Sequence, residues 1–236
     1  MRKLIATMMI MGTTGLAACL PASAQFGLPG IPGGGSLPIP GLGGGGGSGF
    51  STAANSMAIN LKTALYNQSM ALALVGDAMG DKKKATLFRS QASAIQSATT
   101  AKVGDAFSKS QQTIKDNPID LAGLAKVQDA AGQKKIAEAQ GHMDVVILYD
   151  GLAIASAAMM IKEKPGPSDI ANAPAILEAA QLAITALPAQ TSNAKKFNEV
   201  VEAYMKQNNV QKLSASQKTA LAKKTDPGAA SKAGGY

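Results

Sequence analysis

The sequence predicts an all-α protein: an antiparallel bundle of six to seven helices that follows a disordered Gly/Pro-rich N-terminal segment. From residue 51 onward the chain is rich in Ala, Lys, Gln, Leu and Met, which favour helices. Apolar residues recur there at spacings of three and four, the period of an amphipathic helix, and runs of β-branched residues typical of strands are nearly absent. Short polar connections favour antiparallel neighbours.

Residues 1–24 have the layout of a signal peptide. Arg2 and Lys3 precede an apolar run, and small residues before Gln25 fit cleavage between Ala24 and Gln25. The apolar run is too short and too interrupted for a permanent membrane span, which needs about 20 apolar residues. We therefore expect an exported protein of the periplasm or cell envelope.

A second cleavage site is the alternative. The run Leu16-Ala17-Ala18-Cys19 resembles the lipobox of bacterial lipoproteins, in which the cysteine becomes the lipidated first residue. That cut would give an outer-membrane lipoprotein tethered through Cys19, whereas the cut after Ala24 would release the chain. Cys19 is the only cysteine, so the folded part contains no disulfide and depends on packing for its stability.

Residues 25–50 contain twelve glycines and four prolines, which oppose both helix and sheet. We interpret them as a flexible linker. The apolar residues of this linker allow a second interpretation, in which the segment docks on a partner or on a membrane surface. These residues are Phe26, Leu28, Ile31, Leu37, Ile39 and Leu42.

The helical domain is predicted over residues 51–224, with a disordered tail at 225–236. Its first helix runs from about Thr52 to Met79, with a buried face that includes Met57, Leu61, Leu65, Leu72 and Val75. The second helix, capped by Asp81, carries an apolar stripe through Gly104 until Asn117-Pro118 stops it.

Four further segments complete the domain. A third helix is predicted from Asp120 to about Gln140, where Gly141 breaks or bends the path. The fourth, residues 142–164, is apolar nearly all round, which predicts a central buried helix. The fifth helix is predicted to begin near Pro174 and to end at Pro188. The sixth begins at Ser192 or Asn193, and its apolar residues are Phe197, Val200, Val201 and Tyr204. A short last helix spans about Ser214 to Lys224.

His142, the only histidine, precedes Asp144 and Asp150. A histidine and a carboxylate could ligate a metal or carry out acid–base chemistry. Zinc sites need three or four ligands, however, and the chain offers no second histidine. We therefore expect no metal and no cofactor, and we interpret Asp144 as a first-turn residue that complements the dipole of helix 142–164.

Asp150 lies between Tyr149 and Gly151 in the helix predicted to be central. A buried carboxylate needs a partner, and we expect a lysine from a neighbouring helix or a face open to solvent at Gly151. The alternative is a cavity, in which Tyr149, Asp150 and Met159 would bind a small apolar or amphipathic ligand.

Catalytic motifs are missing from the sequence: there is no G-x-S-x-G, no G-x-x-x-x-G-K and no C-x-x-C. The lysines occur in clusters that we interpret as solvated helix faces, and Arg89 is the only arginine after residue 2, which disfavours nucleic acid as a partner. The methionines after the signal region are scattered, as core residues would be.

These observations predict a non-enzymatic structural or interaction protein of the bacterial cell envelope, for example an accessory subunit of an envelope or secretion assembly with a protein partner. The alternative is a periplasmic binding protein that holds the small ligand inside the bundle. The sequence does not specify the partner, the ligand or the oligomeric state.

Overall fold

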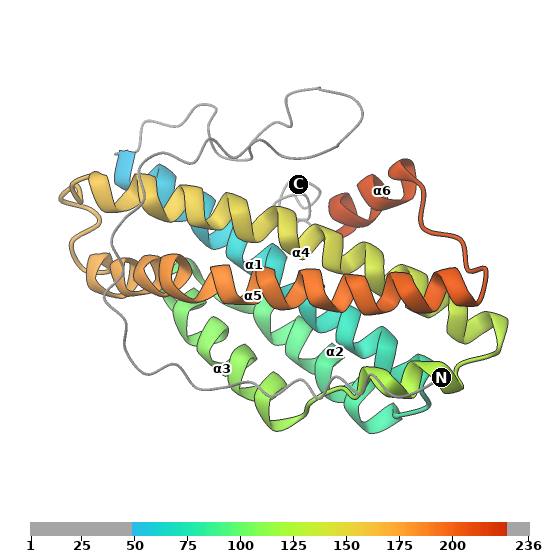
Figure 1. Cartoon of the computed structure of the whole chain (residues 1–236). Coiled ribbons are helices and arrows are strands. Elements are labelled where there is room, and N and C mark those ends of the chain that lie inside the picture. Colours follow the sequence, from blue (N-terminus) through green and yellow to red (C-terminus); the bar gives the residue numbers. More distant parts are fainter. Residues whose placement is uncertain (1–48, 226–236) are drawn as a thin grey trace, which may run out of the picture. The chain divides into compact units, whose positions relative to one another are not determined.

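The computed structural model describes residues 49–225, and their side chains as far as residue 221. Within this range the chain forms six α-helices, two short 3-10 helices and no strand (Figure 1), which confirms the all-α prediction. The elements are α1 (Gly49–Ala78), α2 (Lys82–Ser97), η1 (Thr100–Lys102), α3 (Val103–Asp116), η2 (Leu121–Lys126), α4 (Ala130–Lys162), α5 (Ala173–Gln207) and α6 (Ala215–Thr225).

Several predictions made from the sequence lie outside the described residues. They are the signal peptide, the lipidation candidate Cys19, the cleavage site at Ala24 and Gln25, the linker up to residue 48, and the tail from residue 226. The helical domain itself starts two residues earlier than predicted, because Phe50 packs into the core and extends α1 to Gly49.

Helix α4 packs against α1, α5 and α6, which confirms its predicted central position, but one face of its second half is exposed rather than buried. Asn60 of α1 donates a hydrogen bond to Ser156 of α4 over 3.2 Å, and Asn67 pairs with His142 over 2.7 Å. Residue numbers therefore rise along α1 while they fall along α4, so these two helices run in opposite directions.

The same holds for α4 and α5, which lie side by side in Figure 1. Asp150 contacts Gln190 near the middle of this pair, and Asp144 contacts Asn198 farther along. Two neighbouring pairs therefore run in opposite directions, while the antiparallel order of the whole bundle stays a prediction.

The buried apolar side chains form two clusters. One gathers around the start of α1, the end of α4 and the start of α5, and includes Phe50, Met57, Leu61, Leu65, Ile95, Val103, Phe107, Met160 and Leu187. The other gathers around the opposite ends of these helices, and includes Leu72, Val75, Phe88, Leu124, Ile136, Met143, Val146, Phe197, Val201 and Tyr204. The predicted face of the first helix is buried in these clusters.

The predicted second helix is divided in the structure. Helix α2 ends at Ser97, and α3 begins at Val103 after η1. Lys62 of α1 donates to the carbonyl of Ala98 over 2.7 Å, which satisfies a carbonyl just after the end of α2. Beyond this point Gly104 lies against Ala179 of α5, so the chain changes its packing partner where the helix breaks.

Two predicted helix ends are wrong, because α4 and α5 are each longer and continuous. Helix α4 begins at Ala130, capped by Asp129, and passes through Gly141 without a break. The missing side chain of Gly141 makes room for Leu213. Helix α5 passes through Pro188, which costs a backbone hydrogen bond. Buried residues on both sides of Pro188 hold α5 on its neighbours and offset that loss.

Candidate functional site

His142 is buried on α4 and pairs with a side-chain amide. Its Nδ1 lies 2.7 Å from Oδ1 of Asn67. The side-chain NH2 of Asn67 donates a hydrogen bond to the carbonyl of Thr63 over 2.7 Å. Because the Asn67 oxygen can only accept, Nδ1 of His142 carries the proton and donates. Burial lowers the pKa of His142 to about 4, so the ring is neutral at pH 7. This geometry makes His142 a structural residue rather than a general base exposed to a substrate.

Asp150 is completely buried, and neutral groups of α5 are its partners. Gln190 donates to Oδ1 over 2.9 Å, and Thr191 donates to Oδ2 over 3.0 Å. The partner is therefore neither the expected lysine nor solvent at Gly151. Both groups follow Pro188 on α5, some 40 positions from Asp150, which places them beyond the reach of local sequence reasoning.

Burial raises the pKa of Asp150 to about 7, and the hydrogen bonds from Thr191 and Gln190 act in the opposite direction. A third helix extends the network, because Nε2 of Gln111 on α3 donates to Oε1 of Gln190. Along α4 and α5, Asp150 and Gln190 stand between the segments that form the two apolar clusters. The network therefore forms a polar layer between two apolar parts of the core.

The three residues predicted to bind a ligand do not converge. Asp150 is fully buried, whereas the side chain of Met159 is 45 % exposed. The two are nine residues apart, which is two and a half helical turns, so they point to opposite sides of α4. Tyr149 is half-buried beside Asp150. The ligand-binding hypothesis stays a prediction, with Asp150 as its only fully buried polar group.

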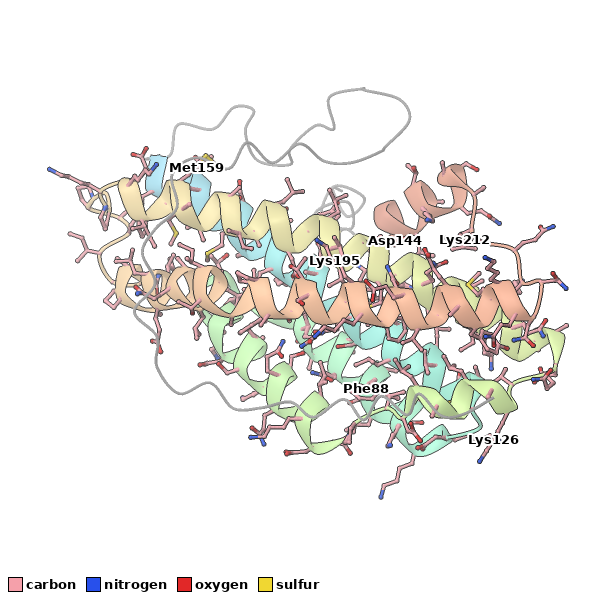
Figure 2. All side chains as sticks on the ribbon, in the orientation of Figure 1. Phe88, Lys126, Asp144, Met159, Lys195 and Lys212 are labelled. Carbon is pink, nitrogen blue, oxygen red and sulfur yellow. The ribbon has the colours of Figure 1, made fainter. Side chains whose placement is uncertain are left out.

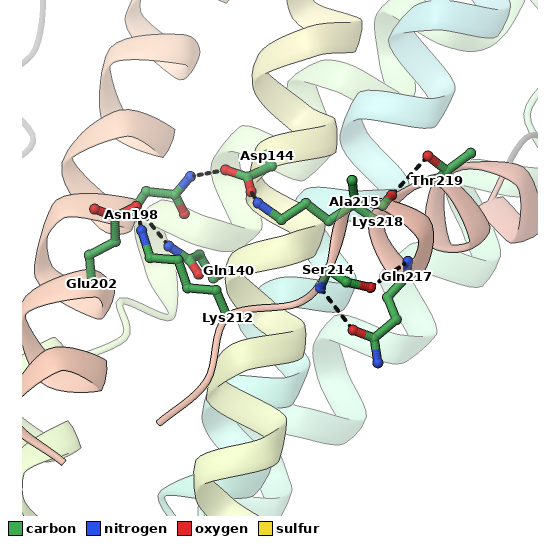
Figure 3. A network of polar contacts seen from close by, with 10 residues as sticks. All are labelled: Gln140, Asp144, Asn198, Glu202, Lys212, Ser214, Ala215, Gln217, Lys218 and Thr219. Atoms are coloured by element: carbon green, nitrogen blue, oxygen red, sulfur yellow. Dashed lines mark hydrogen bonds and ion pairs between the residues drawn. The ribbon is translucent and has the colours of Figure 1, made fainter. Parts of the chain in front are cut away.

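Asp144 occupies the middle of α4 rather than its first turn, because that helix starts at Ala130. It accepts a hydrogen bond from Asn198 of α5 over 2.7 Å and forms an ion pair with Lys218 of α6 over 2.6 Å (Figure 3). The role predicted for Asp144 at a helix terminus is therefore wrong. The carboxylate instead connects α4 to α5 and to the C-terminal helix.

Residues 208–225, which we call the C-terminal arm, return along α4 and place α6 over it (Figure 1). Lys212 forms an ion pair with Glu202 of α5 over 2.7 Å, and Gln140 donates to the same carboxylate oxygen over 3.0 Å (Figure 3). Leu213 lies in the space left by Gly141, with Leu221 nearby. The arm therefore covers this part of α4 with two leucines and anchors them with ion pairs.

A surface hollow of about 310 Å³ lies beside η2, lined by Asp81, Asp120 and Asp129 together with Lys84 and Lys126. Each of the three aspartates is the N-cap of a helix, and each accepts a backbone N–H at that helix's start. Capping accounts for these carboxylates without a ligand. Among residues 49–221, no group of three or more His, Cys, Asp or Glu side chains could hold a metal ion.

The exposed apolar side chains gather at one end of the bundle. Four of the six large ones lie at the end of α4, in the following loop or at the start of α5; we call residues 159–177 the hairpin end. Figure 2 shows Met159 there, far from Asp144 and Lys212. Leu177 is the least exposed of the four, at 36 %. The four are Met159, Ile161, Ile170 and Leu177.

The hairpin end also holds the start of α1. Ser51 donates to Asp169 over 2.6 Å, and the carboxylate of Glu163 lies so close to Gly49 that a Cβ there would come within 2.8 Å of it. Two carboxylates therefore stand at the positive end of the α1 dipole, which has no acidic residue in its own first turn. Consequently, Gly49, the first described residue, lies at the hairpin end.

Comparison with known proteins gives no relative: no protein-family model, no curated protein and no solved structure matches the chain. Among the described residues, only α4 is long and apolar enough to cross a membrane by length and composition. That helix contacts both α1 and α5.

Proposed function

We propose that this protein is an exported, non-enzymatic interaction component of the bacterial cell envelope, and that it binds a partner protein through the hairpin end. The observation that carries this proposal is the concentration of exposed apolar side chains at the hairpin end, beside the start of α1. Ile170 is 65 % exposed, and Met159 and Ile161 are each 45 % exposed. Exposed apolar side chains that cluster on a monomer commonly mark an interaction surface.

The interior of the domain supports an interaction role over ligand binding. Both carboxylate oxygens of Asp150 accept hydrogen bonds, from Gln190 and Thr191, and Nδ1 of His142 is bonded to Asn67. Neither the hollow beside η2 nor a second surface hollow along the end of α5, lined by residues that include Glu199 and Met205, includes Asp150 or His142. These hydrogen bonds connect neighbouring helices, which supports a role for the surface rather than the core in binding other molecules.

The charges at the hairpin end favour a protein over a nucleic acid. Lys162 and Lys164 are offset there by Glu163 and Asp169. Nucleic-acid binding relies on an excess of positive charge along one face. Arg89, the only arginine in residues 49–225, is bound to Asp77.

Site-specific photo-crosslinking in the native host tests the proposal. A photo-reactive amino acid at Ile170 should crosslink to one envelope protein, whereas the same group at Val200, which is 40 % exposed on α5, should not. The purified partner should then bind Ile161→Ser/Ile170→Ser at least tenfold more weakly than the unmodified chain, with Val200→Ser unchanged. Equal crosslinking from Ile170 and Val200, or equal binding by all three chains, would refute the proposal.

The cellular location needs its own measurement. The intact mass of the mature protein from membrane and soluble fractions distinguishes a chain that begins at Gln25 from an acylated chain that begins at Cys19. A chain that keeps residues 1–24 in both fractions would contradict export.

A further inference from the structure

The C-terminal arm covers a face of α4 and α5 that has unsatisfied acceptor atoms. We call this face the arm face; its residues are Gln140, Gly141 and Asp144 of α4 with Asn198 and Glu202 of α5, and Figure 3 shows the four polar ones. The NH2 group of Gln140 donates to Glu202 over 3.0 Å, and that of Asn198 donates to Asp144 over 2.7 Å. The oxygens of the same two amides are buried and have no hydrogen-bond partner among the described residues. Because each oxygen shares a carbon atom with its NH2 group, each lies beside a carboxylate that the arm binds.

The lysines of the arm do not fill these acceptors. Lys212 bonds to Oε1 of Glu202, and Lys218 bonds to Oδ2 of Asp144. An ammonium group acts as a point charge, whereas the planar guanidinium of arginine has five donors and can bond two oxygens at once. A guanidinium in place of either lysine could bond the carboxylate together with the amide oxygen beside it. The arm face therefore suits arginine better than the lysines that occupy it.

The arm is held on this face by few contacts. None of residues 208–221 is buried. The side chains of Lys212 and Glu202 are 53 % and 49 % exposed, and ion pairs of that kind contribute little to stability. The second hollow, of about 450 Å³, lies between the end of α5 and Val210 and Lys212 of the arm. Residues 208–214 connect α5 to α6 without a helix or strand, so the arm can leave without disturbing α4 and α5.

We infer that the arm face is a docking site for a segment of another protein that carries arginine and leucine, and that the arm holds this place until the partner binds. The arm itself shows the pattern that fits, because Leu213 lies in the space at Gly141 and the two lysines reach the two carboxylates. Those lysines make the only ion pairs of Asp144 and Glu202 within the described part of the chain, so the face without the arm is complementary to a basic segment.

The arm face is separate from the hairpin end, as Figure 2 shows for Asp144 and Met159. The docking site therefore goes beyond the proposed function, and each proposal can fail without the other.

Fluorescence anisotropy with labelled peptides tests the docking site. The lysine peptide has the sequence of residues 208–225, and the arginine peptide carries Lys212→Arg/Lys218→Arg. The mature protein is used as wild type and as Lys212→Glu/Lys218→Glu, in which charge reversal opens the arm but leaves the arm face unchanged. The opened variant should bind the arginine peptide about tenfold more tightly than the wild type does, because its own arm no longer competes. It should bind the arginine peptide about threefold more tightly than the lysine peptide.

Hydrogen exchange and two further variants check where the peptide binds. In the opened variant, exchange should be faster in α6 alone, and the circular dichroism spectrum should keep its helical signal. Adding Asp144→Asn/Glu202→Gln to the opened variant should weaken binding of the arginine peptide about tenfold, because both negative charges are lost. Adding Glu178→Gln instead is the matched control, since Glu178 is an exposed carboxylate near the start of α5, and binding should not change.

Several results would overturn the assignment. Equal binding by the opened variant and the wild type would show that the arm does not hold the site, and equal binding of the two peptides would show that the amide oxygens are not used. A wild-type dimer that the charge reversal dissociates would assign the face to the arm of a second copy. Release of the arginine peptide by calcium chloride at constant ionic strength would assign it to a metal ion. Ile170 takes no part in these measurements, so crosslinking from that residue remains an independent test of the proposed function.

Discussion

His142 and Asp150 are two turns apart on the same helix, and burial acts on them in opposite directions. Each is buried, each is hydrogen-bonded to a side chain of a neighbouring helix, and neither has an ionic partner. Burial lowers the pKa of His142 to about 4 and raises the pKa of Asp150 to about 7. The common cause is the cost of a charge away from water, which disfavours the protonated form of a base and the ionised form of an acid.

These two shifts have opposite consequences for stability. The folded chain binds a proton at Asp150 more tightly than the unfolded chain does, so this residue makes the fold less stable as pH rises from about 4 to about 7. The folded chain binds a proton at His142 less tightly, so that residue makes the fold less stable as pH falls from 6.5 to about 4. Between pH 4 and 6.5 the two contributions largely cancel.

The largest expected effect comes from Asp150→Asn. The amide keeps the shape and stays neutral, so above pH 7 it removes the cost of the ionised carboxylate, up to roughly 4 kcal/mol. Urea unfolding at pH 8 should show the variant to be more stable than the wild type by a few kcal/mol, and unfolding at pH 4 should show little difference. Asp144→Asn is the control, since Asp144 is partly exposed and has Lys218 as a partner. Equal destabilisation by Asp150→Asn at both pH values would disprove the assigned role.

The next largest effect is the contribution of His142 to the pH dependence of stability, measured apart from that of Asp150. With Asp150 neutralised by the same Asp150→Asn change, the opposing contribution of His142 is no longer cancelled. As pH decreases from 6.5 to 4, the free energy of unfolding of Asp150→Asn should therefore fall by roughly 3 kcal/mol more than that of Asp150→Asn/His142→Asn. Asparagine can still donate to Asn67 as Nδ1 does, which limits other losses. Parallel pH profiles for the single and double variants would show that His142 does not titrate as the structure indicates.

A smaller effect is expected from the outer part of the Asp150 network. Gln111→Leu removes the hydrogen bond to Gln190 and leaves the contacts of Asp150 intact. We expect a loss of about 1 kcal/mol, nearly independent of pH, in denaturant unfolding. A loss confined to pH above 7 would instead mean that Gln111 controls the ionisation of Asp150.

The smallest effect is expected from loss of the ion pair between Asp144 of α4 and Lys218 of α6. Lys218→Ala removes an ion pair whose two side chains are each about one-third exposed, so the global stability should change by about 0.5 kcal/mol or less. Hydrogen exchange in α6 should increase, because this pair helps to hold the C-terminal arm on α4. Unchanged exchange in α6 would show that Leu213 and Leu221 hold the arm without the ion pair.

Much of the fold could be predicted because the relevant signals are local. The buried face of α1 follows from the spacing of Met57, Leu61 and Leu65, and the start of α6 falls within a residue of the prediction. The breaks predicted at Gly141 and Pro188 are wrong because packing outweighs local propensity there. Leu213 occupies the space at Gly141, and buried residues on both sides of Pro188 keep α5 continuous there.

The candidate sites were less accessible to sequence reasoning. Asp150 was singled out because a carboxylate inside an apolar helix needs a partner, but its partners Gln190 and Thr191 lie some 40 residues away. The hairpin end was missed because exposure depends on which helix faces the neighbours cover. One available signal was Ile170, an isolated apolar residue in a loop that contains Pro-Gly-Pro.

The sequence by itself determined that residues 51–224 form helices, which faces of most of them are apolar, and that two ionisable residues sit in the most apolar helix. These properties follow from periodicity and composition along the chain. Only the tertiary structure decided that His142 and Asp150 are paired with neutral side chains, and that α4 and α5 continue through Gly141 and Pro188. It also decided that large apolar side chains are exposed at one end of the bundle. Each of these depends on contacts between residues far apart in sequence, whose packing free energy exceeds the local preferences of the chain.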